Sequence, residues 1–105
     1  MQLGELARRA PEDVTIKEYQ GSGARGPIFG PLVTLEVRVE WRRRLVEAGE
    51  GSQRISEATL LCDPDFDPPL ESQVTIDGKR YEVVEVLKER GLSLDYYQTE
   101  VLVAP

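Results

Sequence analysis

The sequence predicts a single all-β domain, folded as a small antiparallel β-barrel or a strongly curled sandwich. Apolar and polar residues alternate along several stretches, the longest from Val33 to Trp41, which is the pattern of strands with one buried face. Turn-forming residues separate these stretches at short intervals, and short turns imply antiparallel pairing. The pattern gives about six strands, and a sheet this small avoids exposed edges best by closing on itself.

Length and composition predict one soluble domain, residues 1–105. Hydrophobic residues are 40% and charged residues 30% of the chain, which is ordinary for a globular protein. No apolar run approaches the roughly 20 residues that a membrane-spanning helix needs, so no membrane partner is expected. The first residues lack the apolar segment of a secretory signal, which predicts synthesis in the cytoplasm.

Helix is expected only at the N-terminus. Apolar residues in Leu3 to Ala10 have helical spacing, and Pro11 would end a helix there. Residues 1–12 are therefore predicted to form either one short helix or an N-terminal arm.

Asp13 to Tyr19 reads as a strand with a slip or bulge near its end, followed by the glycine-rich segment Gly21 to Pro31. Its first three glycines match the G-x-G-x-x-G pattern of dinucleotide-binding proteins, which requires a helix to begin at the last glycine. Pro27 and Pro31 forbid that helix. We therefore expect a flexible connector between two strands, with no nucleotide and no other cofactor bound.

Two strands joined by a charged loop form the centre of the prediction. The first strand should bury a stripe on one face, consisting of Val33, Leu35, Val37, Val39 and Trp41. The second runs from Ile55 to Cys62. Between them, the segment Arg42 to Arg54 contains three consecutive arginines and several turn formers, which predicts a loop projecting beyond the sheet.

The segment Asp63 to Leu70 alternates aspartates as a calcium-binding loop does at its start, but Pro68 and Val74 occupy positions that need glycine and glutamate. No metal site is therefore expected. The prolines make it an extended connector, with Phe66 and Leu70 as expected anchors in the core.

The clearest local signal is a hairpin in Gln73 to Lys88, with Asp77-Gly78 as its two-residue turn. In its second arm the apolar residues change parity between Val83 and Val84, which indicates a bulge or a strand covered on both faces. A further turn is expected between Gly91 and Asp95. A terminal strand then runs from Tyr97 to Val103.

Charge and residue usage argue against catalysis. The chain has no histidine, which removes the commonest general base and metal ligand. Its one cysteine, Cys62, reads as a buried apolar residue. The net charge of −6 opposes general binding to nucleic-acid phosphates. No catalytic residues are assigned.

Several features in order resemble a known family. They are Y-x-G-x-G-x-x-G-P-x-x-G-P at Tyr19 to Pro31, the arginine cluster that ends the long strand, and V-T-I-D-G-K-x-Y-x-V-x-x-V at Val74 to Val86. Over Asp13 to Val103 the chain resembles the head-closure proteins of long-tailed bacteriophages, also called stopper, head-completion or head–tail connector proteins.

This resemblance implies a structural virion protein of the phage neck. Such proteins are small β-barrels that form a ring, usually of twelve copies, beneath the portal and adaptor rings. Their long loop points into the channel, where it helps retain packaged double-stranded DNA without sequence specificity. The ring then presents the docking surface for the tail-completion or tail-terminator protein.

Carried onto this chain, the resemblance implies two assembly segments. The channel loop corresponds to residues 44–54, and the arginine cluster with the loop gives its charged candidates: Arg42, Arg43, Arg44, Glu47, Glu50 and Arg54. The glycine-rich connector is suited to ordering against neighbouring rings, and its candidates are Gly21, Gly23, Arg25, Gly26 and Phe29.

The arginine cluster has two interpretations from its residues alone. It binds DNA phosphate or acidic groups of an adjacent ring, or it is a solvated strand end paired with Glu47, Glu50 or Glu57. Three other function classes stay open. They are a tail-completion or other tail-side connector protein, an OB-type nucleic-acid-binding barrel and an enzyme using paired carboxylates.

Overall fold

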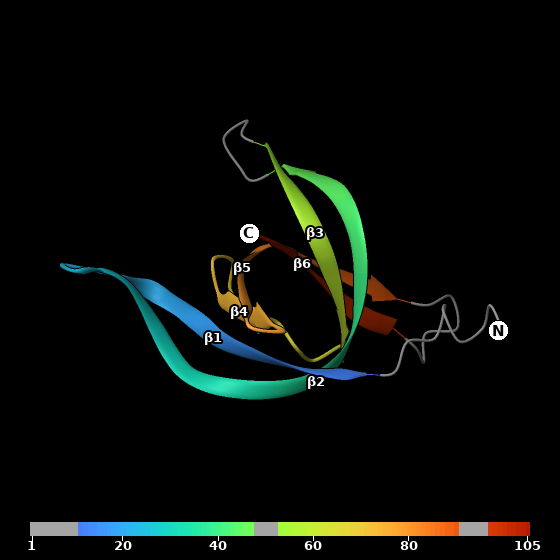
Figure 1. Ribbon diagram of the computed structural model, residues 1–105, viewed down its shortest axis with the longest axis horizontal. Helices are drawn as coiled ribbons and strands as arrows, with labels where there is room; N and C mark the ends of the chain where they lie inside the picture. Colours follow the sequence, from blue (N-terminus) through green and yellow to red (C-terminus); the bar gives the residue numbers. More distant parts are fainter. Residues whose placement is uncertain (1–10, 48–52, 91–96) are drawn as a thin grey trace, which may run out of the picture.

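The computed structural model describes residues 11–47, 53–90 and 97–105, and among them every regular element is a β-strand (Figure 1). The strands are β1 (Glu12–Gly23), β2 (Gly26–Glu47), β3 (Gln53–Cys62), β4 (Gln73–Ile76), β5 (Lys79–Arg90) and β6 (Tyr97–Ala104). The predicted N-terminal helix, Glu50 and the turn at 91–95 lie outside the described residues.

The six strands form a closed antiparallel barrel in the order β1-β2-β3-β6-β5-β4, as the sequence predicted. The short strand β4 closes the ring, because it pairs with β5 on one side and with β1 on the other, where Thr15 lies opposite Thr75. Closure gives each strand a neighbouring strand on both sides over part of its length, although β1 and β2 extend beyond the region where both sides are paired.

Alternating residues of all six strands fill the barrel interior. The largest fully buried side chains include Ile16, Leu60 and Ile76. Because neighbouring residues of a strand point to opposite faces, this core takes every second residue of each strand. The buried members of the core cluster are Val14, Ile16, Val37, Val39, Ala58, Leu60, Cys62, Val74, Ile76, Tyr81, Val83, Val101 and Val103.

The hairpin between β4 and β5 confirms both local predictions for this stretch. Asp77 and Gly78 have positive φ angles of 50° and 81°, as a mirror-image two-residue turn requires. A register shift follows between Val83 and Glu85. Val84 is the extra residue of this bulge, so Val83 points into the barrel while Val84 joins a second apolar cluster.

The connector between β3 and β4 is held against the barrel by side chains of β5 and β6. Lys88 Nζ donates hydrogen bonds of 2.9 Å to the carbonyl oxygens of Pro64 and Phe66, and Thr99 Oγ1 donates one of 3.2 Å to Pro64. Phe66 packs against the core, as expected. Leu70 does not, since it is 54% exposed.

The predicted buried stripe on β2 is wrong at both ends. Val33 is 45% exposed and Trp41 is 43% exposed. The cause is the staggered pairing of β2, because β1 pairs with it only as far as Val37 and β3 only from Arg38 onward. Val37 and Val39 lie at the change of partner and face the core cluster, whereas the two ends of the stripe extend past that cluster. Trp41 still contacts Tyr81, with ring centroids 6.0 Å apart.

Two segments predicted to be irregular are mostly strand. The glycine-rich segment from Gly21 to Gly30 is a hairpin rather than a flexible connector, since Ser22 pairs with Pro27 and Gly23 with Gly26. Within the expected loop from Arg42 to Arg54, residues 42–47 belong to β2 and residues 53–54 to β3, because Leu45 pairs with Ile55 and Glu47 with Gln53. The rest of that prediction lies outside the described residues.

Candidate assembly surfaces

Two hairpins extend beyond the barrel wall and carry all the sequence-predicted site residues that the structure describes (Figure 1). We call residues 18–32 the β1–β2 arm and residues 42–47 with 53–57 the β2–β3 arm. The first projects at the left of Figure 1 and the second at the top. In each arm the described strands pair with one another apart from the register shifts, so these strand residues present defined surfaces.

The β2–β3 arm is tied to the barrel by two of the predicted arginines. Arg44 Nη1 lies 3.3 Å from Glu100 Oε1 on β6. Arg54 Nη1 lies 3.0 Å from Glu82 Oε2, and its Nη2 donates a 2.8 Å hydrogen bond to the carbonyl oxygen of Pro105. Arg44 and Arg54 are therefore anchors within the chain. Their carboxylate partners differ from the glutamates that the sequence suggested.

An apolar contact supports the same anchoring. Val46, on the β2–β3 arm, is 2% exposed and belongs to a second buried cluster with Val84, Leu102 and Ala104. These three residues lie on β5 and β6, so the arm covers part of those strands. A one-residue register slip in the arm would carry Val46 to the opposite face, and the register shift between Trp41 and Arg44 fixes which face it takes.

The opposite face of the β2–β3 arm is apolar and exposed. Leu45 and Ile55 form a cross-strand pair, and they are 66% and 53% exposed. Arg42 and Arg43 are exposed beside them. Glu47 lies in a hollow with Asp67, Pro68 and Leu70. This face combines apolar area with two free-standing guanidinium groups, which is a composition found at protein interfaces.

The β1–β2 arm is shaped by its glycines. Gly21 and Gly26 have φ angles of 109° and 110°, a conformation that other residues rarely adopt. Phe29 packs edge-on to Tyr19, with ring centroids 5.9 Å apart. Arg25 is exposed at the tip, and Ile28 and Leu32 are 48% and 59% exposed.

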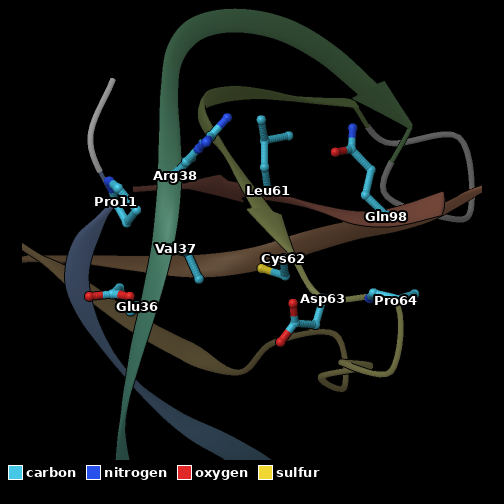
Figure 2. A pocket seen from close by; sticks show the side chains of 9 residues that line it. All are labelled: Pro11, Glu36, Val37, Arg38, Leu61, Cys62, Asp63, Pro64 and Gln98. Carbon is cyan, nitrogen blue, oxygen red and sulfur yellow. The ribbon is translucent and has the colours of Figure 1, made fainter. Parts of the chain in front are cut away.

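A groove opens where β3 leaves β2. Thr34, Leu35, Glu36 and Val37 line one side, and the connector residues Asp63, Pro64, Asp65 and Phe66 line the other. An adjoining hollow shares Glu36 and Asp63, and Arg38 and Gln98 also line it (Figure 2). We call the two together the β2-edge groove. Its carboxylates are exposed, while Leu35 and Phe66 form an apolar floor.

Two observations bear on metal binding and on the reactivity of the cysteine. Within them, no three His, Cys, Asp or Glu side chains lie close enough to hold a metal ion. Burial, with help from the negative charge of Asp63, raises the pKa of the Cys62 thiol to about 12. A thiol that stays protonated near neutral pH is a poor nucleophile.

Comparison with known proteins assigns no family: no family model matches the chain, and no curated protein matches it significantly. In the described part of the chain, no helix is long and apolar enough to cross a membrane.

Sequence reasoning placed Arg44 and Arg54 on the right segment but missed their partners. Glu82 and Glu100 are separated from them by 28 and 56 positions, and no local pattern links such distant residues. The β2-edge groove was missed for a similar reason, because it depends on where β3 stops pairing with β2.

Proposed function

We propose that this chain is a head-closure protein of a long-tailed bacteriophage. Copies of it form a ring in the neck of the virion, beneath the portal and adaptor proteins, and the ring retains packaged DNA and receives the tail. The resemblance of residues 13–103 to that family suggests this function, and the small closed barrel with two projecting hairpins agrees with it.

The observation that carries the proposal is the exposed apolar surface of the two arms. Ile28 and Leu32 on one arm, and Leu45 and Ile55 on the other, are each about half exposed or more. A monomer gains nothing by presenting apolar side chains on projecting hairpins, whereas an assembling subunit buries them. Because the arms leave the barrel in different directions (Figure 1), they suit contacts with different neighbours.

Charge along the chain is segregated in a way that suits a DNA channel. Residues 42–54 hold four of the 13 basic residues and two of the 19 acidic ones. Arg44 and Arg54 are engaged within the chain, which leaves Arg42 and Arg43 exposed for phosphate oxygens. Two such groups per copy give a ring of sequence-independent contacts, while the acidic remainder of the chain repels DNA and favours sliding.

Assembly of particles lacking the protein tests the proposal. The phage that encodes the chain should package its genome without it, but the filled heads should lose DNA and fail to join finished tails. Heads that keep their DNA while the tails are defective would favour the tail-completion alternative instead. Infectious particles at normal yield would refute a role in the neck altogether.

A double charge reversal, Arg42→Glu with Arg43→Glu, separates DNA retention from folding. Both side chains are exposed on β2, so the purified variant should unfold at a denaturant concentration close to that of the wild type. In particles it should lower DNA retention, because acidic groups at the lumen repel phosphate. Lys17→Glu on β1 is the matched control, since Lys17 is exposed and pairs with Leu32 and Gln73, away from the β2–β3 arm. Equal DNA retention in both variants would contradict the assignment of Arg42 and Arg43.

A further inference from the structure

The β2-edge groove runs beside a strand edge that has no partner among the described residues. On one side, β2 pairs with β1 from Gly26 to Val37. On the other side, pairing with β3 begins only at Arg38. The outer edge of β2 before Arg38 is therefore open, and the connector at Asp63 to Phe66 forms the facing wall of the groove. An open edge of this kind accepts an added strand.

Prolines determine which part of this edge is usable. Pro27 has no N–H, so it cannot donate to a strand added at the tip of the arm. Nearer the barrel, Tyr19 N–H donates to Ser72 Oγ on the β4 side of β1. Alternation from Tyr19 to Lys17, which pairs with Leu32, then gives the outer edge of β2 the N–H and C=O groups of Leu32, Thr34 and Glu36. The edge is thus blocked near the tip of the arm and competent for pairing beside the groove.

We propose that the β2-edge groove binds the β1–β2 arm of a second copy of this chain by strand addition. The arm has a proline-free edge of its own, because β4 pairs with β1 only from Thr15 to Lys17. Tyr19 N–H on this edge donates a 3.0 Å hydrogen bond to Ser72 Oγ, so the part open to a partner begins after Tyr19. Residues 18–23 of β1 therefore have β2 on one side and no strand on the other in the described structure. In the proposed contact, this edge of β1 in one copy forms backbone hydrogen bonds with the outer edge of β2 in the next copy.

Side chains of the arm and the groove are complementary in charge and polarity. Arg25 is the only charged residue between Gln20 and Leu32, and the groove presents Glu36, Asp63 and Asp65. Ile28, 48% exposed on the arm, would be buried against the apolar floor of the groove. In the proposed contact, Arg25 of one copy faces the acidic side chains at the rim of the groove in the next copy, and Ile28 faces the apolar floor.

The contact must be between copies. Arg25 and Glu36 lie on one hairpin, 11 positions apart, and an extended strand separates such residues by roughly 30 Å. The arm leads away from the groove of its own barrel (Figure 1). Because arm and groove are different surfaces, each contact leaves one arm and one groove free. Repetition then adds copies in one direction, which gives a ring or an open filament. The inference rests on the proposed neck function only in that a ring needs such a head-to-tail contact.

Disulfide trapping tests the pairing directly. Copies carrying Arg25→Cys are mixed with copies carrying Glu36→Cys and oxidised, and a covalent dimer of one copy of each should form. The matched control mixes Arg25→Cys with Arg80→Cys, whose position is exposed on the far side of the barrel. Both mixtures also carry Cys62→Ala, because native Cys62 lines the same groove as Glu36 (Figure 2). An equal yield of dimer in both mixtures would overturn the proposal.

A charge exchange provides the second test, read by sedimentation of the purified chain over a range of concentrations. Arg25→Glu and Glu36→Arg should each weaken self-association by about tenfold or more, and the chain with both changes should recover most of it. Arg80→Glu should leave association unchanged. A wild-type chain that stays monomeric at millimolar concentration, or association insensitive to Arg25→Glu, would refute the arm–groove contact. Neither result depends on phage particles, so failure of this contact and failure of the neck function are told apart.

Discussion

Replacing Val46 by alanine distinguishes an anchored β2–β3 arm from a free loop. Val46 is 2% exposed and packs with Val84, Leu102 and Ala104. The substitution removes two carbon atoms, worth about 0.8 kcal/mol each by transfer, and leaves a small cavity that adds to the loss. We expect the free energy of unfolding to fall by about 2 kcal/mol in urea denaturation followed by circular dichroism.

The neighbouring residue supplies the control. Leu45→Ala removes more carbon atoms on the same strand, but Leu45 is 66% exposed, so its cost should stay within about 0.5 kcal/mol. Both changes also lower strand propensity, so the difference between them isolates the burial of Val46. If Val46→Ala lowers the free energy of unfolding no more than Leu45→Ala does, the arm is not packed on β5 and β6. The ion pairs of Arg44 and Arg54 would then not anchor the arm to the barrel.

Three further predictions concern the barrel itself. Trp41→Ala should lower the free energy of unfolding in urea by about 2 kcal/mol, less than the roughly 3–5 kcal/mol lost for a fully buried aromatic residue. The reason is that the indole is 43% exposed yet contacts Tyr81. A loss above about 4 kcal/mol, the middle of the range for buried aromatic residues, would contradict this exposure. Gly78→Ala should cost about 1 kcal/mol or more, since Gly78 has a φ angle of 81°, and unchanged stability would argue against the mirror-image turn. Cys62 has a raised pKa of about 12, against 9.0 for a free thiol, so between these pH values the folded chain keeps a proton that the unfolded chain loses. The free energy of unfolding should therefore fall as pH rises from 9 to 12. Cys62→Ala should flatten this fall, and an equally steep fall in the variant would refute the raised pKa of Cys62.

The anchored arm changes how a neck protein of this kind would hold DNA. The resemblance alone implied a channel loop from Arg44 to Arg54, but these two residues bind Glu100 and Glu82 within the chain. That leaves Arg42 and Arg43 as the exposed basic groups of the arm. The proposed contact with DNA is therefore made by side chains on a paired strand, whose position is set by the barrel.

Local sequence determined the strands, the tight turn and the fold class. Period-two alternation marked most of β1 to β6, and Asp77-Gly78 marked its hairpin because few residue pairs adopt two positive φ angles. The parity change at Val83 and Val84 predicted either a bulge or a strand covered on both faces, and the structure contains a bulge there. These features depend on neighbours in the chain, so they can be read without knowledge of distant contacts.

Tertiary structure determined how many residues of each strand are paired with its neighbours. Glycine and proline in residues 21–31 normally interrupt strands, yet here two glycines supply positive φ angles and Pro27 can lie on an open edge. The polar segment after Trp41 stays extended because Val46, Arg44 and Arg54 find partners on β5, β6 and the C-terminal residue.

Alternation fixed which β2 residues share a face, but it could not say where that face is covered. Val33 and Trp41 share the parity of Val37 and Val39, and only the central two are buried. Burial requires a core in front of the residue, and β2 faces the core cluster around residues 37–39, where its partner changes from β1 to β3. The stagger of β1 and β3 along β2 is set by contacts among all six strands of the closed barrel, which is why a pattern within one strand does not contain it.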